Sequence, residues 1–184
     1  MTQMEEAEFM TLKVVWLSCP YPEVTLELEK MLEEKFRVYE GQELSVDEAP
    51  SSIIYCPKGE DVSSEEVRRL RAQAPDAPIL VLGLGVDTQG ARAALLAGAD
   101  GFIYLGMQTT QIIHALSAPL NGETLVSREL LEAFLVEKVS QVDTVLTPRQ
   151  REFLELVATS PISGRDYVLP RELLEAFLRD ALVA

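Results

Sequence analysis

The sequence predicts an α/β fold in which a five-stranded parallel sheet carries helices on both faces, followed by a helical C-terminal extension. Over residues 12–116 short apolar segments alternate with amphipathic segments, and this alternation is typical of right-handed βαβ units. The segment from Pro78 to Gly83 is apolar throughout, as expected of a central strand that is covered by helices on each side. Beyond Gly122 we find no further strand pattern.

The first βα unit begins with an apolar run at residues 12–18, which ends at Cys19-Pro20-Tyr21-Pro22 because proline interrupts a strand. From residue 23 to 36 the apolar side chains fall close to one stripe at helical spacing, with acidic residues outside it. Residues 37–40 are a weak strand candidate. Residues 41–49 leave room for little more than one helical turn.

The next strand is predicted at residues 51–56, and Ser63 opens a helix that runs to about Gln73. Ser63 is the expected N-cap, and Glu66 three residues later completes a capping box. The remaining elements are expected at 78–83 (strand), 87–99 (helix), 101–105 (strand), 109–116 (helix), 127–139 (helix), 148–158 (helix) and 170–182 (helix). We therefore divide the chain into an acidic lead (1–11), a doubly wound domain (12–121) and a helical extension (122–184).

Composition and charge exclude several classes of protein. The chain has 184 residues, of which 47% are hydrophobic, and its net charge is −14; this acidic excess repels phosphates and anionic lipid surfaces. The longest uncharged apolar stretch, 77–86, has 10 residues, about half of the ~20 that a membrane-spanning helix needs. The first ten residues are acidic, where a signal peptide would be basic. We expect a cytoplasmic protein without membrane contact.

Three motifs resemble parts of known regulators. Gly98-Ala99-Asp100-Gly101-Phe102-Ile103 resembles the segment that leads into the last strand of response-regulator receiver domains. Gly122-Glu123-Thr124-Leu125, followed by Ser127-Arg128-Glu129-Leu130, is similar to the receiver exit of the LuxR/GerE-type (NarL/FixJ-like) regulators. Leu146-Thr147-Pro148-Arg149-Gln150-Arg151-Glu152-Phe153-Leu154 resembles the opening of their DNA-binding domain. The resemblance implies a flavodoxin-like receiver with strand order 2-1-3-4-5 and a role in two-component signal transduction and transcription regulation.

The resemblance also predicts where phosphorylation chemistry should occur, and there the sequence departs from the family. Receivers hold Mg²⁺ with carboxylates after the first strand, phosphorylate an aspartate after the third, and use a hydroxyl and a lysine after the fourth and fifth. This chain has Ser18 and Cys19, Cys56, Gly83 and Leu105 at those positions. All five are replaced, so we predict a pseudo-receiver that is not phosphorylated there and that has no catalytic residues, metal or cofactor.

The C-terminal extension departs from the family in a different way. From residue 146 onward the chain is too short for the four helices of a LuxR-type DNA-binding domain, so this region resembles a truncated helix-turn-helix region. Five basic and six acidic residues lie there, and Glu172, Glu175 and Asp180 fall in the segment nearest to the recognition helix. Acidic side chains oppose contact with DNA phosphates. DNA is therefore a doubtful partner.

We interpret the chain as a phosphorylation-independent regulatory protein that acts through protein–protein contacts and is not an enzyme. The first alternative is a DNA-binding transcription regulator with a minimal helix-turn-helix tail. Receivers of this kind associate through the fourth helix, fifth strand and fifth helix, which predicts a homodimer. The corresponding face would contain Ala93, Leu96, Gln111, His114 and Ala115.

The second alternative is a thiol redox sensor that uses Cys19 and Cys56. In the strand order 2-1-3-4-5 the ends of the first and third strands are neighbours, about 4.8 Å apart. A disulfide between the two cysteines is therefore geometrically feasible. Two other interpretations stay open: two small apolar thiols that fill a pocket without need of charge, and a two-thiol metal site.

The octapeptide Arg-Glu-Leu-Leu-Glu-Ala-Phe-Leu occurs twice, at 128–135 and 171–178. Each copy places its leucines and phenylalanine on one helical face. The copies have either arisen from Leu/Glu-rich composition alone or form matched faces that pack on each other or across a dimer interface. Neither interpretation makes the chain a solenoid.

Overall fold

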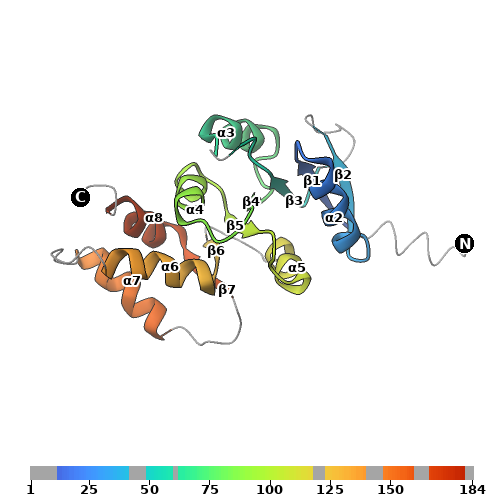
Figure 1. Ribbon diagram of the computed structural model, residues 1–184. Coiled ribbons are helices and arrows are strands. Elements are labelled where there is room, and N and C mark those ends of the chain that lie inside the picture. The colour runs from blue at the N-terminus through green and yellow to red at the C-terminus, as the bar shows by residue number, and fades with distance from the viewer. Residues whose placement is uncertain are drawn as a thin grey trace, which may run out of the picture.

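The computed structural model of the chain describes residues 12–41, 49–59, 62–117, 123–139, 147–159 and 166–180. One mixed sheet runs through the molecule, with α2 and β2 at one end and α6, α7 and α8 grouped at the other (Figure 1). The elements are β1 (Lys13–Ser18), α2 (Pro22–Leu32), β2 (Phe36–Glu40), β3 (Ser52–Tyr55), α3 (Ser64–Gln73), β4 (Ile79–Gly83), α4 (Thr88–Leu96), β5 (Gly101–Tyr104), α5 (Thr109–Ser117), β6 (Glu123–Ser127), α6 (Arg128–Val139), α7 (Pro148–Thr159), β7 (Asp166–Pro170) and α8 (Arg171–Asp180).

The sheet has the order β2-β1-β3-β4-β5-β6-β7. Its first five strands are parallel in the predicted order 2-1-3-4-5, which confirms the flavodoxin-like class. The prediction of five strands was wrong, because β6 adds to β5 in parallel and β7 adds to β6 antiparallel. Each extra strand has five residues and passes into a helix without an intervening turn, so neither is bounded at its C-terminal end by the turn residues that mark a strand.

The apolar core has two parts, one on each face of the sheet. Along β1, Val15 and Leu17 contribute to the core under α2 and α5, whereas Trp16 contributes to the core under α3 and α4. This alternation follows from the two-residue period of a strand. The second part of the core also contains buried residues of α6, α7 and α8, so the C-terminal extension and the receiver share one hydrophobic core.

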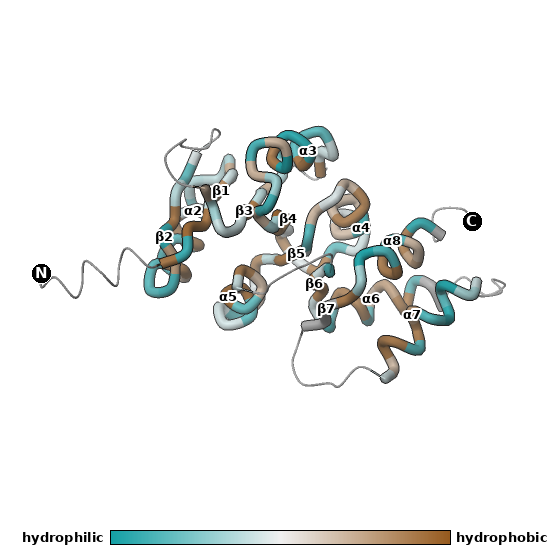
Figure 2. The backbone as a smooth tube through the Cα atoms, turned by 180° about the vertical axis from the view of Figure 1, so that it is seen from behind, coloured by the Kyte–Doolittle hydropathy of each residue, from teal (hydrophilic) through white to brown (hydrophobic). Residues whose placement is uncertain are grey.

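Two predicted helix starts are confirmed. The amide of Glu66 donates to Ser63 Oγ at 3.2 Å at the start of α3, which confirms the N-cap. The Glu66 carboxylate bonds to Arg69 instead of completing the predicted capping box. At α7 the capping box is reciprocal: the Gln150 amide donates to Thr147 Oγ1 at 3.2 Å, and the Thr147 amide donates to Gln150 Oε1 at 2.9 Å. In the view from behind, α7 and α8 each contain both hydrophilic (teal) and hydrophobic (brown) residues (Figure 2), as expected of helices that bury one face.

The two octapeptide copies occupy equivalent places in two consecutive strand-helix units. One follows β6 and the other follows β7, and each begins at the first residue of its helix. Leu125 pairs with Val168 at the centre of both strands, and Glu123 pairs with Pro170 at the ends. The pairing is therefore symmetric about the strand centres, so that β6–α6 and β7–α8 are related as two halves of a local pseudo-twofold arrangement.

Candidate functional site

A cavity of about 640 Å³ opens at the carboxyl ends of β1 and β3, the end of the sheet at which doubly wound folds bind ligands. Three of the five residues assigned to the phosphorylation positions line this cavity, whereas Gly83 and Leu105 do not. The lining residues are Ser18, Cys19, Pro20, Glu40, Gly41, Tyr55, Cys56, Lys58, Ser63, Glu66 and Arg69. The structure thus brings together the β1 and β3 positions and leaves the β4 and β5 positions outside.

The two cysteines are neighbours within this cavity, as predicted. Cys56 is buried, 4% exposed, and belongs to the core under α2 and α5, against which half-buried Cys19 also packs. Burial raises the pKa of the Cys56 thiol strongly, and hydrogen bonding to the neighbouring Cys19 thiol raises this pKa further. Cys19 Sγ donates to the carbonyl oxygen of Tyr21 at 3.6 Å. Cys56 is consequently a protonated, apolar thiol at neutral pH, and it is a poor nucleophile.

The charged residues of the cavity wall are partly neutralised. Arg69 Nε donates to Glu66 Oε2 at 2.9 Å, and a second guanidinium nitrogen contacts the other carboxylate oxygen. This hydrogen bonding holds the pKa of Glu66 below its ordinary value. Burial, followed by the Glu66 charge, raises the pKa of Tyr55. Sequence reasoning recognised Glu66 only as part of the helix cap, although its spacing to Arg69 is also that of a helical ion pair.

Gly83 ends β4 in a place where a side chain has no room. A Cβ atom at this position would lie 2.3 Å from Cζ of Phe102, a ring that is 1% exposed. The hydroxyl residue that the resemblance predicts here would therefore displace the ring, and such overpacking costs about 1–3 kcal/mol. Leu105, at the lysine position, packs against the core under α2 and α5. Gly83 and Leu105 are thus both fixed by their packing against neighbouring apolar side chains.

Asp100 joins the receiver to the C-terminal extension. Its carboxylate, 10% exposed, contacts Arg71 of α3 through one oxygen and Arg171 of α8 through the other. The Ile79 amide also donates to Asp100 Oδ2 at 2.8 Å, and Arg71 and Arg171 both reach the carbonyl oxygen of Gly98, at 3.3 and 3.4 Å. The motif that carries the receiver resemblance therefore also binds the first residue of the second octapeptide, a role that sequence reasoning missed.

A second set of polar contacts fixes α6 on α4. Arg92 of α4 donates to Glu137 Oε2 at 2.9 Å, and its guanidinium carbon lies 5.8 Å from the ring centroid of Phe134. Thr88 Oγ1 donates to the other oxygen of Glu137. Because α8 also packs against α4, the chain covers much of this helix by itself.

This coverage changes the predicted dimer face. Ala115 is 1% exposed and lies in the core of its own protomer, so its inclusion in a partner surface was wrong. Leu96 packs against the core shared with the extension, and Gln111 is half-buried, its Oε1 accepting from the Gln108 amide at 3.1 Å. Ala93 and His114 are exposed. The predicted dimer face is therefore reduced to its two exposed residues, Ala93 and His114.

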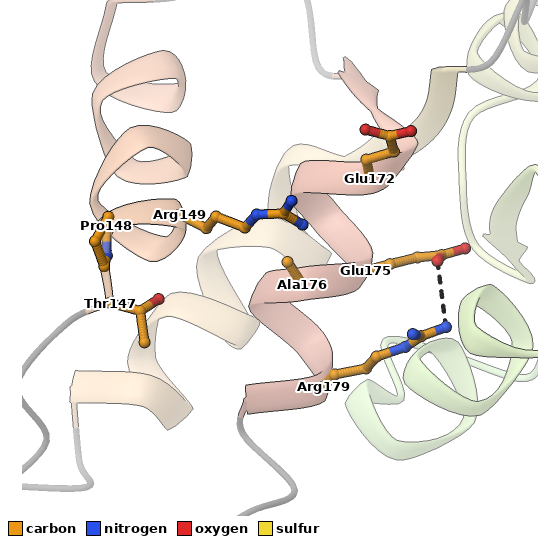
Figure 3. A pocket seen from close by; sticks show the side chains of 7 residues that line it. All are labelled: Thr147, Pro148, Arg149, Glu172, Glu175, Ala176 and Arg179. Carbon is orange, nitrogen blue, oxygen red and sulfur yellow. Dashed lines mark hydrogen bonds and ion pairs between the residues drawn. The ribbon is translucent and has the colours of Figure 1, made fainter.

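The C-terminal extension has a cavity of its own, of about 580 Å³, between the start of α7 and α8. Figure 3 shows Arg149 reaching from α7 toward α8, where Glu172 and Glu175 lie, and Glu175 accepts from Arg179 at 3.5 Å. Acidic and basic side chains are thus interleaved here. Such a surface differs from the continuous basic patch that is typical of a DNA-binding face.

No protein-family model matches this sequence. The transcriptional regulatory protein MctR of Rhizobium johnstonii is 27% identical over 112 residues, which are 61% of this chain and 50% of MctR. The chain thus spans about half the length of this curated relative. Among solved structures, the RcsB response regulator of Salmonella typhimurium is similar with a TM-score of 0.54 at 17% identity. The superposition covers 94% of this chain and 91% of the RcsB chain.

A structure of RcsB in complex with DNA is similar with a TM-score of 0.54 at 20% identity. The superposition covers 80% of this chain and 77% of that RcsB chain. At these identities the likenesses show the fold. Together with the sheet order, they show a flavodoxin-like fold of the kind found in response regulators, in a chain whose sequence is similar to part of MctR. Within the part of the chain that the structure describes, none of the helices combines the length and apolar character needed to cross a membrane.

Proposed function

We propose that this protein is a phosphorylation-independent, response-regulator-like regulator of transcription that acts through protein–protein contacts. The state of Cys56 carries the proposal. At the phosphoacceptor position stands a buried thiol whose pKa is raised, so that it is not an anionic nucleophile at neutral pH. The neighbouring Ser18 and Cys19 offer Mg²⁺ no carboxylate in place of the acidic pair.

We expect no phosphorylation of the wild-type chain when it is incubated with acetyl phosphate and Mg²⁺. The measurement is intact mass spectrometry, with a phosphorylatable receiver domain treated in parallel to show that the donor is active. The matched control is Cys56→Ala, which should behave as the wild type. A phosphoryl adduct that appears in the wild type and disappears in Cys56→Ala would refute the proposal.

The position of α8 supports action through protein contacts. Three of its apolar side chains, Leu174, Phe177 and Leu178, are buried in the core, and Arg171 is engaged by Asp100. The helix that the resemblance places near the recognition-helix position, α8, is thus packed against the receiver. A homodimer is part of the proposal, with Ala93 and His114 as candidate contacts.

DNA binding is the second candidate, favoured by the capped start of α7, which has the form expected from the LuxR-type motif. In a fluorescence-anisotropy titration of a random-sequence duplex at several salt concentrations, we expect no binding, because of the net charge of −14. The control is the double variant Arg149→Glu and Arg151→Glu, whose altered side chains are exposed on α7. Binding that weakens steeply with salt and is lost in this variant would instead establish a DNA-binding tail.

A further inference from the structure

Cys19 and Cys56 are held side by side by the backbone of the sheet. Ser18 and Tyr55 form the last pair of the parallel β1–β3 register, and the Cys56 amide donates to the carbonyl oxygen of Ser18 at 2.9 Å. The next position of the same register contains the two cysteines. Paired residues of adjacent strands lie on one face of a sheet about 4.8 Å apart, and both cysteines contact the core under α2 and α5.

This arrangement is close to what a disulfide requires. Bridged cysteines have Cα atoms about 4.4–6.8 Å apart and Cβ atoms that face each other. Strand neighbours on one face meet the first condition without movement of the sheet. Disulfide formation would break the hydrogen bond from the Cys19 thiol to the carbonyl oxygen of Tyr21, because Cys19 would no longer carry a proton.

The two thiols differ in their access to solvent. Cys19 is half-buried on the cavity wall, whereas Cys56 is 4% exposed beneath it. The cavity, at about 640 Å³, falls within the size range of sites that admit small molecules. A reagent from solution therefore meets Cys19 first, and only then Cys56.

We propose that Cys19 and Cys56 form a reversible dithiol site, which a small disulfide oxidises to an intramolecular Cys19–Cys56 disulfide. The Cys19 thiolate attacks one sulfur of the small disulfide, forms a mixed disulfide, and releases the first thiol. Cys56 is a poor nucleophile toward a reagent in solution, but here it is held beside the mixed disulfide. As its sulfur bonds to Cys19 Sγ, the S–S bond of the mixed disulfide breaks and the Cys56 proton passes to the departing thiolate. The two protein thiol protons end on the two released thiols, so the protein loses two electrons and the small disulfide gains two.

Oxidation would change the cavity that the protein presents at this end of the sheet. The loop after β1 and the loop after β3 are already joined by the Gly59 amide, which donates to the Tyr21 hydroxyl oxygen at 2.9 Å. A covalent bond from Cys19 to Cys56 would fix these two loops together and remove both thiol protons from the cavity. Oxidation of the two cysteines would therefore regulate this pseudo-receiver without phosphorylation.

The test uses the full chain and glutathione disulfide under native conditions, followed by intact mass spectrometry and peptide mapping without reductant. The wild type should lose the mass of two hydrogen atoms, retain no titratable thiol, remain a single chain, and return to its original mass with dithiothreitol. Cys56→Ser should instead accumulate glutathione on Cys19. Cys19→Ser should be modified at least tenfold more slowly than Cys56→Ser.

Three outcomes would overturn the proposal: a wild-type chain that stops at the glutathione adduct, a disulfide between two chains, or thiols that react only after denaturation. Reaction of the denatured wild type confirms that the reagent is active. Because phosphorylation is measured separately by its own adduct, failure here leaves the proposed function standing. Conversely, a phosphorylated chain could still form the disulfide.

Discussion

Replacement of Asp100 by alanine is expected to destabilise the protein by about 3 kcal/mol, toward the lower end for a broken buried ion pair. The carboxylate is 10% exposed and neutralises Arg71 and Arg171, which are 33% and 26% exposed. Its removal leaves two partly buried guanidinium groups and the Ile79 amide without their acceptor. In a chain of this size the melting temperature should fall by about 6–12 °C, measured by circular dichroism.

The control is Glu132→Ala, which removes an exposed partner of Arg128 on the surface of α6 and should change stability by less than about 0.5 kcal/mol. Asp100→Asn separates charge from hydrogen bonding, since its amide oxygen can still accept from Ile79. A double-mutant cycle between Asp100→Asn and Arg171→Ala should show a coupling of about 0.5–3 kcal/mol. Strict additivity would mean that the contact does not join the extension to the receiver.

Alanine at equivalent leucines of the two octapeptides is expected to have unequal effects. Leu130 in α6 is fully buried, whereas its equivalent in α8, Leu173, is only partly buried. The order is reversed at the eighth position, where Leu178 is fully buried and Leu135 is partly buried. Leu130→Ala and Leu178→Ala should each cost about 2–5 kcal/mol, because each leaves a cavity.

The partners Leu173→Ala and Leu135→Ala should cost roughly half as much, because less apolar surface leaves water at those positions. Urea denaturation of the four variants measures the differences, and each variant serves as the control for its sequence equivalent. Equal losses at positions 130 and 173 would show that the copies are buried alike. The structural reason for the difference is that α8 also packs against α7, where Phe177 stacks on Phe153 with centroids 4.5 Å apart.

Much of the fold could be predicted because its determinants are local. The apolar run at Pro78 to Gly83 indicates a central strand, and β4 occupies it. The N-cap at Ser63 forms as the sequence indicates, since the bonded atoms are only three residues apart. The order of the first five strands, taken from the resemblance, also placed Cys19 beside Cys56.

The extension was harder to predict. β6 and β7 are stabilised by pairing with strands elsewhere in the chain, and this pairing has no local signature. The lack of room for a side chain at Gly83 depends on the Phe102 ring, and the position of Leu105 depends on the packing under α2 and α5. These are contacts between residues that are distant in sequence.

The sequence by itself determined the alternating α/β class, the helix starts, and the absence of a carboxylate at Ser18, Cys19 and Cys56, because each depends on residue type and short-range spacing. Only the tertiary structure decided that Asp100 binds arginines from α3 and α8, and that the C-terminal helices share the core of the receiver. It also decided that two identical octapeptides bury different leucines. The physical reason is that burial and ion pairing depend on which surfaces meet, and two equal helices next to different neighbours exclude water from different side chains.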